Sequence, residues 1–281
     1  MRYIGSKSSS IEEIYDLVSQ FQAGGTFCDP FGGTATVGSY FKQKGFQVFT
    51  GDLLQFAHYI QIAKLAYHIQ PEFIKLKRYL GFACTEDLVN YLNDLPHATQ
   101  WFVQNFAIDR GYFTRENAEK VEAVWLEIIR FKKVGAIDGN EFAYLMASLI
   151  EAMDRVANTA GTYYAYLKKI SVKAARIFEF LLIKPMPGEF IGSSTLGDAY
   201  DLVTDRYYDV IYLDPPYNDR RYHGYYHLPE ALARGIMPDV AGTAGVCKIN
   251  MTLDTDFYKV SSALASLTKI LEAAKFKVLL F

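Results

Sequence analysis

The sequence predicts an open α/β sheet that is interrupted by a mainly helical insertion. One segment near each end of the chain has the order expected of parallel α/β units, with apolar strands, helices and an acidic residue directly after a strand. From Asp52, in the first segment, to Asp198, in the second, the chain runs 146 residues. A crossover between neighbouring parallel strands needs only about a dozen to a few dozen residues, so roughly 110 residues are inserted.

The first segment begins with a helix predicted over residues 11–21, which has apolar residues on one face and serines that can cap its start. A short strand over 26–28 follows and ends in Asp29-Pro30-Phe31-Gly32-Gly33-Thr34. A second helix then runs to about Lys44, and a strand over 46–50 leads into Gly51-Asp52. This order is typical of a nucleotide-binding βαβ unit.

The middle of the chain is predicted to be helical over 85–95, 115–133 and 139–158, and a basic tract follows (Lys168, Lys169, Lys173, Arg176 and Lys184). The second sheet segment contains a short helix after Gly197-Asp198, a strand over 209–213, a helix over 257–274 and a strand over 277–281. We therefore predict two domains: residues 1–70 with 190–281, and an insertion over 71–189.

The composition is that of an ordinary globular protein. The 281 residues are 51% apolar and carry 29 Lys and Arg against 31 Asp and Glu. This composition excludes a disordered, collagen-like or disulfide-stapled chain, and the net charge of −2 excludes a uniformly basic nucleic-acid-coating protein but not a local basic face. Three widely spaced cysteines match no metal-ligand pattern, so we expect reduced thiols and a cytoplasmic protein. The sequence contains no run of about 18 apolar residues, so we expect no membrane-spanning helix.

The glycine turn after the first strand is a candidate ligand site. Gly32 and Gly33 allow the backbone to approach a ligand at a helix start, and Asp52 lies where an acid can bind the two hydroxyls of a ribose. The turn is not GxGxxG, and GxxxxGK[ST] is absent from the chain, which disfavours dinucleotides and nucleoside triphosphates. For this segment alone, a turn with a helix cap is an equally good interpretation.

The strongest signal is Asp214-Pro215-Pro216-Tyr217, which follows an apolar strand. Ligands of open α/β sheets bind at the carboxyl ends of the strands. A carboxylate and a nearby proline carbonyl can accept both hydrogens of an exocyclic amine, and Tyr217 can stack on the base that bears it. If the amine is methylated, these fixed acceptors stabilise the positive charge that develops on its nitrogen.

Three blocks resemble motifs of one enzyme family: RYIGSK, FCDPFGGTATVG and YLDPPYNDRRYHGYYHLPEALA, which begin at Arg2, Phe27 and Tyr212. The family is the Dam-like N6-adenine DNA methyltransferases in the alpha motif order, and the likeness is greatest to their type II restriction-modification members. A weaker block, NTAGTYYAYLKK from Asn158, resembles a segment of their recognition region. The resemblance implies a Rossmann-like sheet that binds S-adenosyl-L-methionine (AdoMet), with an inserted target-recognition domain.

The resemblance also implies roles for individual residues. The catalytic motif would be Asp214, Pro215, Pro216 and Tyr217, and AdoMet would be bound by Tyr3, Gly5, Lys7, Asp29, Phe31, Gly33, Asp52 and Asp198. Double-stranded DNA, with the target adenine flipped out of the helix, would be contacted by Lys168, Lys169, Lys173, Arg220 and Arg221. For the two arginines, a solvated loop is about as good an interpretation.

Two alternatives remain open at this stage. The family normally continues past the strand that ends at Phe281, so the chain could be an incomplete or non-catalytic DNA-binding subunit that needs a completing chain. The same four catalytic residues could act on RNA or on cytosine N4. The partner could be a cognate restriction endonuclease.

His223 and His227 have i, i+4 spacing but no carboxylate cluster beside them, so we expect no metal site.

Overall fold

The computed structural model describes residues 1, 3–216, 221–249 and 255–281, without the side chain of residue 260. The chain forms two compact units. We call Tyr3–Ile69, Lys184–Tyr222 and Met251–Phe281 the sheet unit, and Met1–Arg2, Gln70–Ile183 and His223–Asn250 the helical unit. The predicted domain boundaries differ from these units mainly at residues 223–250, which pack with the insertion and not with the sheet.

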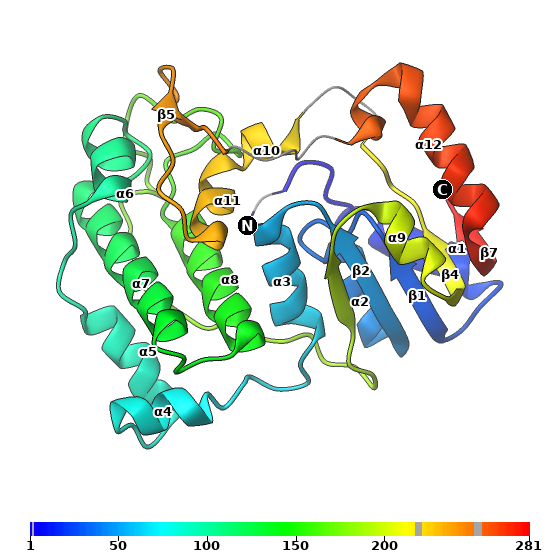
Figure 1. The fold of residues 1–281 in the computed structure, drawn as a ribbon, viewed down its shortest axis with the longest axis horizontal. Helices are drawn as coiled ribbons and strands as arrows, with labels where there is room; N and C mark the ends of the chain where they lie inside the picture. Colours follow the sequence, from blue (N-terminus) through cyan, green and yellow to red (C-terminus); the bar gives the residue numbers. More distant parts are fainter. Residues whose placement is uncertain (2, 217–220, 250–254) are drawn as a thin grey trace. The chain divides into compact units, whose positions relative to one another are not determined.

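The sheet unit is built on five parallel strands in the order β3-β2-β1-β4-β7 (Figure 1). Their bounds are Gly25–Asp29 for β1, Phe46–Asp52 for β2, Ser193–Leu196 for β3, Tyr207–Tyr212 for β4 and Lys275–Leu280 for β7. The chain passes from β1 to β2 on one side, whereas β4 pairs with β1 on the other side. The carboxyl ends of β1 and β4 therefore form a topological switch point, where open α/β sheets bind ligands.

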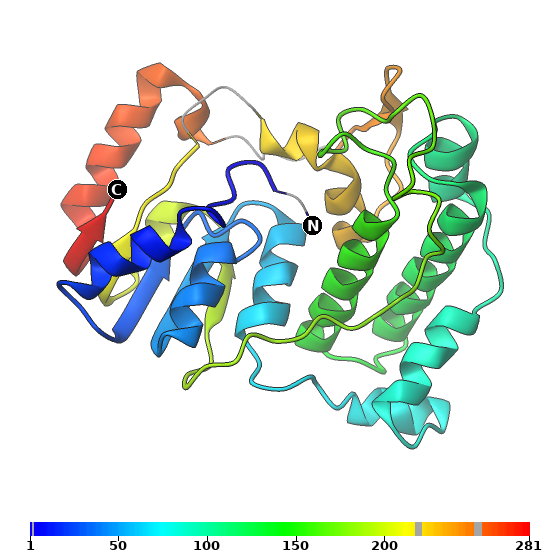
Figure 2. The same ribbon diagram turned by 180° about the vertical axis from the view of Figure 1, so that it is seen from behind.

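Helices cover both faces of this sheet (Figures 1 and 2). On one face lie α1 (Ile11–Ser19), α2 (Thr36–Gln43) and α3 (Gln55–Leu65), and on the other lie α9 (Ala199–Thr204) and α12 (Val260–Ala273). Because side chains alternate along a strand, Phe27 packs in the first core, where its ring stacks on Phe41 at 3.8 Å, whereas the next residue, Cys28, packs in the second. The predicted α/β class is confirmed by this arrangement.

The helical unit consists of helices and one short hairpin. The helices are α4 (Ile74–Leu80), α5 (Thr85–Asp94), α6 (Trp101–Val103), a π-helical turn (Gln104–Ile108), α7 (Arg115–Lys133), α8 (Gly139–Arg155) and α11 (His227–Arg234); the hairpin is β5 (Val240–Ala241) with β6 (Val246–Cys247). The four-residue helix α10 (Tyr222–Tyr225) lies where the chain leaves the sheet unit. Capping explains two helix starts, because the Thr114 side chain accepts from the N–H of Asn117, and Asp138 forms a capping box with Glu141.

No helix in the described part of the chain is both long and apolar enough to cross a membrane. No group of three or more His, Cys, Asp or Glu side chains there is arranged to hold a metal ion.

Candidate active site

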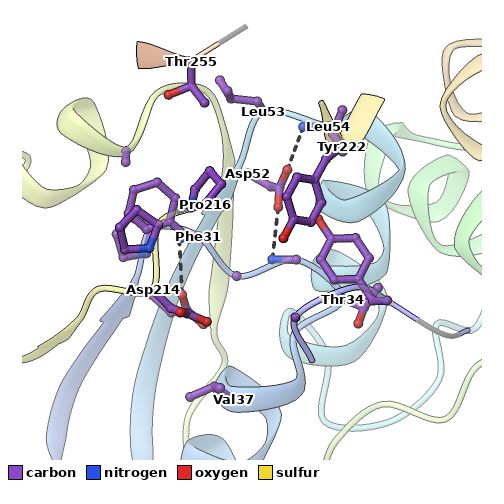
Figure 3. Close-up of a pocket in the computed structure, with 18 of the residues that line it drawn as sticks. Phe31, Thr34, Val37, Asp52, Leu53, Leu54, Asp214, Pro216, Tyr222 and Thr255 are labelled. Atoms are coloured by element: carbon purple, nitrogen blue, oxygen red, sulfur yellow. Dashed lines mark hydrogen bonds between the residues drawn. The ribbon is translucent and has the colours of Figure 1, made fainter. Parts of the chain in front are cut away.

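A pocket opens at the carboxyl ends of β1, β2 and β4, within the sheet unit (Figure 3). The empty space within it, including the open mouth, is about 980 Å³. It is lined by the N-terminal segment, by the glycine turn after β1, by the residues after β2 and β4, and by the start of α9.

Asp52 fixes the backbone around the glycine turn. Its Oδ2 accepts from the N–H of Gly33 at 3.1 Å and its Oδ1 accepts from the N–H of Leu54 at 2.9 Å, as the dashed lines in Figure 3 show. Gly33 has φ +49°, and a Cβ atom there would lie 2.6 Å from the ring of Tyr3. A glycine is therefore required both by the backbone conformation and by the close approach of the tyrosine.

Asp29 is a buried carboxyl group at the floor of the pocket, 2% exposed. Its pKa is raised to about 8, mainly by burial and also by the neighbouring carboxylates of Asp214 and Asp52, although the N–H of Phe31, which donates to Oδ1 at 3.2 Å, lowers it. At neutral pH this group is therefore mostly a neutral acid. A cationic ligand beside it would favour the carboxylate form.

Asp214 follows β4 and points into the same pocket. Lys7 Nζ lies 2.9 Å from its Oδ2, and both side chains are about one-quarter exposed. Pro215 and Pro216 line the pocket beside it, and neither has a backbone N–H. The arrangement thus presents carboxylate and carbonyl acceptors at the strand end.

The structure brings most of the predicted site residues together. The pocket is lined by all eight predicted cofactor residues and by three of the four predicted catalytic residues, namely Tyr3, Gly5, Lys7, Asp29, Phe31, Gly33, Asp52, Asp198, Asp214, Pro215 and Pro216. Tyr217 and Arg220 lie outside the described residues. This grouping supports the predicted roles, which stay predictions.

Sequence reasoning missed two aromatic side chains at the pocket. The rings of Tyr222 and Tyr3 lie 5.7 Å apart, and the Tyr222 ring lies nearly parallel to that of Tyr258, with centroids 6.5 Å apart. The N–H of Tyr222 donates to the hydroxyl of Tyr258 at 3.3 Å. Tyr222 lies in the sequence block that contains the DPPY motif, but no local pattern places Tyr258 beside it.

The predicted DNA-contacting lysines lie in the helical unit. Lys168 and Lys169 are exposed, and Lys173 is half-buried with Nζ 3.7 Å from Asp154. The loop that carries them is held by the fully buried Asn158, whose amide donates to the carbonyls of Gly111 and Leu167 and accepts from the N–H of Ser171. The predicted Arg221 belongs to the sheet unit and is exposed.

Two further asparagines continue this pattern along the basic tract. Asn117, on α7, bonds to the backbone of Ala174, Arg176 and Phe178, and Asn93, on α5, bonds to the backbone of Phe180. The tract is thus a non-helical segment, with a turn at residues 172–175, whose backbone is held by the side chains of these three asparagines. It presents its lysines on a fixed backbone.

The fold is an open α/β sheet with a pocket at the carboxyl ends of its strands, which is where such sheets bind ligands. A comparison with family models matches residues 3–279 to the D12 class of N6 adenine-specific DNA methyltransferases, and the chain belongs to that family. The family predicted from the three sequence blocks is therefore confirmed. Transfer of a methyl group requires a methyl donor.

Several curated relatives are type II methyltransferases or modification methylases. The chain is 33% identical over 255 residues to the type II methyltransferase M.FokI of Planomicrobium okeanokoites. The matched region covers 88% of this chain and 39% of that protein. It is 32% identical to modification methylase LlaI of Lactococcus lactis subsp. lactis, over 87% of this chain and 40% of the relative. It is 32% identical to M.NlaIII of Neisseria lactamica, over 83% and 69%.

The chain spans about two-fifths of the length of the first two of these relatives. No solved structure matches it significantly.

Proposed function

We propose that this chain is an AdoMet-dependent, sequence-specific DNA methyltransferase that acts on the N6 amine of adenine. The observation that carries the proposal is the placement of Asp214 and Pro215 in the same pocket as the glycine turn after β1. The acceptors that would hold the amine and the backbone that would hold the methyl donor thus share one cavity. Family membership supports the same reaction.

The lining of the pocket fits AdoMet, whose methionine part carries an amine and a carboxylate. Lys7 offers a cation for the carboxylate, and Asp29 offers an acid that ionises beside an amine cation. Asp52 would bind the ribose hydroxyls, Asp198 the adenine, and Tyr3, Gly5, Phe31 and Gly33 would line the methionine part. AdoMet, when bound, supplies a methyl group on a sulfonium centre.

The chain's own residues would orient the target amine and stabilise its charge. The Asp214 carboxylate and the Pro215 carbonyl would each accept one N–H of the amine, so that the nitrogen lone pair faces the donor. Positive charge develops on the nitrogen during transfer, and these fixed acceptors stabilise it without acting as a strong base. Pro216 stiffens the turn, and Tyr217 would stack on the base.

DNA would be held by both units of the chain. An adenine inside a duplex is out of reach, so the base must leave the helix, and stacking in the pocket offsets part of the lost stacking. The helical unit would be the target-recognition domain, with Lys168, Lys169 and Lys173 on phosphates. Arg220 and Arg221 would contact DNA near the flipped nucleotide.

The proposed setting is a restriction-modification system, with a cognate restriction endonuclease as the companion. The relatives supply this part of the proposal, because their names are those of type II methyltransferases and modification methylases.

The variant Asp214→Ala tests the division of roles. We expect methylation to fall at least 10²–10³-fold, as when one preorganised charge-stabilising group is removed, with AdoMet affinity nearly unchanged. The exposed carboxylate of Asp201 on α9 provides a matched control, and Asp201→Ala should retain full activity. Methylation of DNA and equilibrium binding of AdoMet are measured in parallel. An equal loss of both in Asp214→Ala would refute the assignment.

A further inference from the structure

Two side chains of α3 hold the glycine turn from outside the pocket. Gln61 Nε2 donates to the carbonyl of Gly33 at 3.0 Å, and Lys64 Nζ donates to the carbonyl of Thr34 at 2.9 Å. Gln61 is fully buried, whereas Gly33 and Thr34 line the pocket. The backbone that would face the cofactor is thus fixed through groups that do not line it.

The turn needs such support because its backbone conformation is not intrinsically favoured. Gly33 has φ +49°, and Ala35, two residues on, has φ +59° although it has a Cβ atom. Left-handed conformations of residues other than glycine are disfavoured and persist only where surrounding contacts determine them. The hydrogen bonds from Gln61 and Lys64 are contacts of this kind.

The direction of the Gln61 amide follows from its surroundings. Its Nε2 faces the carbonyls of Gly33 and Gly51, the second at 3.4 Å, and a carbonyl can only accept. Its Oε1 therefore faces Ser194, whose hydroxyl donates to it at 2.6 Å. If the amide were reversed, two oxygens would face each other at the turn.

One further group completes the chain of donors. Ser194 Oγ lies 2.7 Å from His58 Nδ1, and because the single hydroxyl proton is already directed to Gln61, the histidine must donate. Burial lowers the pKa of His58, so the neutral ring with its proton on Nδ1 is the expected form near pH 7. The donors then run in one direction, from His58 through Ser194 and Gln61 to the Gly33 carbonyl.

We propose that Gln61 is a positioning residue for AdoMet binding, and that Ser194 and His58 set its orientation. Because the peptide group is planar and trans, fixing the Gly33 carbonyl toward α3 also fixes the Thr34 N–H in the opposite direction. The relay thereby prepares the turn before the cofactor arrives. The inference rests on the proposed binding of AdoMet at this turn.

The variant Gln61→Met keeps the side-chain length and removes the amide. We expect AdoMet affinity to fall about tenfold, as for the loss of one or two buried hydrogen bonds, with DNA affinity unchanged within about twofold. Gln20→Met, an exposed position on the sheet unit, is the matched control and should bind AdoMet normally. Both affinities are measured by calorimetry on the whole chain.

A second variant separates positioning from packing. Gln61→Glu keeps the acceptor for Ser194 and loses the donor, so AdoMet should bind weakly at pH 8 and recover toward the unmodified chain at about pH 5.5, where the introduced carboxyl group is protonated and donates again. The affinity of Gln61→Glu is compared with that of the unmodified chain at each pH, because the ionisable groups around the turn, namely Asp29, Asp52, His58 and Lys64, are present in both proteins. A ratio that does not change with pH would contradict the role of the donor.

The orientation step has its own readout. Ser194→Ala should weaken AdoMet binding about threefold to tenfold in the unmodified chain and have no effect when Gln61→Met is already present. Nitrogen-15 spectra should show the His58 proton on Nδ1. Additive effects of the two substitutions, or a proton on Nε2, would overturn the relay.

The outcomes for the two proposals are distinguishable. If the unmodified chain binds AdoMet and Gln61→Met binds it equally well, the inference fails and the proposed function stands. If the unmodified chain does not bind AdoMet, both fail.

Discussion

The substitution Asp29→Asn should make the sheet unit less sensitive to pH. The asparagine keeps the shape of the neutral acid, and its oxygen can still accept from the N–H of Phe31, which donates to Asp29 at 3.2 Å. The buried carboxyl group has its pKa raised from 3.8 to about 8. A raised pKa means that the folded chain binds the proton more tightly than the unfolded chain does. The stability that this proton confers is fully present below pH 3.8 and is lost as pH rises toward about 8.

The magnitude follows from the width of this window. Each pH unit between the two pKa values lowers the free energy of unfolding by about 1.36 kcal/mol. The unmodified chain should therefore lose about 3 to 4 kcal/mol of unfolding free energy relative to Asp29→Asn between pH 5 and pH 8. Asp201→Asn, on the exposed side of α9, is the control and should differ from the unmodified chain by the same amount at every pH in this range.

Urea unfolding followed by far-ultraviolet circular dichroism measures the difference. Trp101 and Trp125 both lie in the helical unit, so tryptophan fluorescence reports that unit separately. A difference between Asp29→Asn and the unmodified chain that stays constant from pH 5 to pH 8 would refute the idea that Asp29 is a neutral buried acid.

Three further predictions concern the cofactor, the DNA and the basic loop. AdoMet binding at pH 7 should release about one proton, because a cation beside Asp29 lowers the pKa of that carboxyl group. Calorimetry in buffers of different ionisation enthalpy measures the number of protons released. The same release on binding to Asp29→Asn would contradict the assignment to Asp29. Lys168→Ala with Lys169→Ala should weaken DNA binding and reduce the salt slope by about 2, whereas Lys133→Ala, on α7, should not; an unchanged slope would remove both lysines from the interface. Asn158→Ala should lower the free energy of local unfolding of the loop by about 3 kcal/mol, about 1 kcal/mol for each of the three side-chain hydrogen bonds of Asn158. Tryptic cleavage at Lys168 and Lys169 should then be about a hundredfold faster, and unchanged cleavage would show that other contacts hold the loop.

The sequence predicted the elements whose signal is local. Strands β1, β2, β4 and β7 are short apolar runs, and the helices α7 and α8 have strong apolar periodicity between clear caps. Their predicted bounds agree with the structure within a few residues; the helix predicted over 139–158, for instance, ends at Arg155. Gly33, Asp52 and Asp214 could be chosen because acids and glycines directly follow these strands, whereas the other site residues were predicted from the family resemblance.

What the sequence did not predict depends on contacts between distant residues. Strand β3 (Ser193–Leu196) is polar and mostly exposed, and only its pairing with β2 identifies it. Helix α11 lies at the end of the sequence block that contains the DPPY motif, yet its buried face packs in the helical unit, where the carbonyl of Leu232 accepts from the indole of Trp125 at 3.0 Å. A helical pattern predicts a buried face but not its partner.

The relay from His58 to Gly33 is non-local in the same way. Ser194 lies 133 residues after Gln61 and 136 after His58. The residue types of His58, Gln61 and Ser194 are not unusual at their positions, so only the folded sheet shows that the three side chains meet.

The central test is to incubate the chain with labelled AdoMet and DNA that lacks adenine methylation, and then to identify the labelled nucleoside after digestion. We expect N6-methyladenine, formed by the unmodified chain and not by Asp214→Ala. Label in N4-methylcytosine, or in RNA but not in DNA, would contradict the proposed substrate. Absence of label although AdoMet binds would contradict the proposal that the chain is itself a methyltransferase.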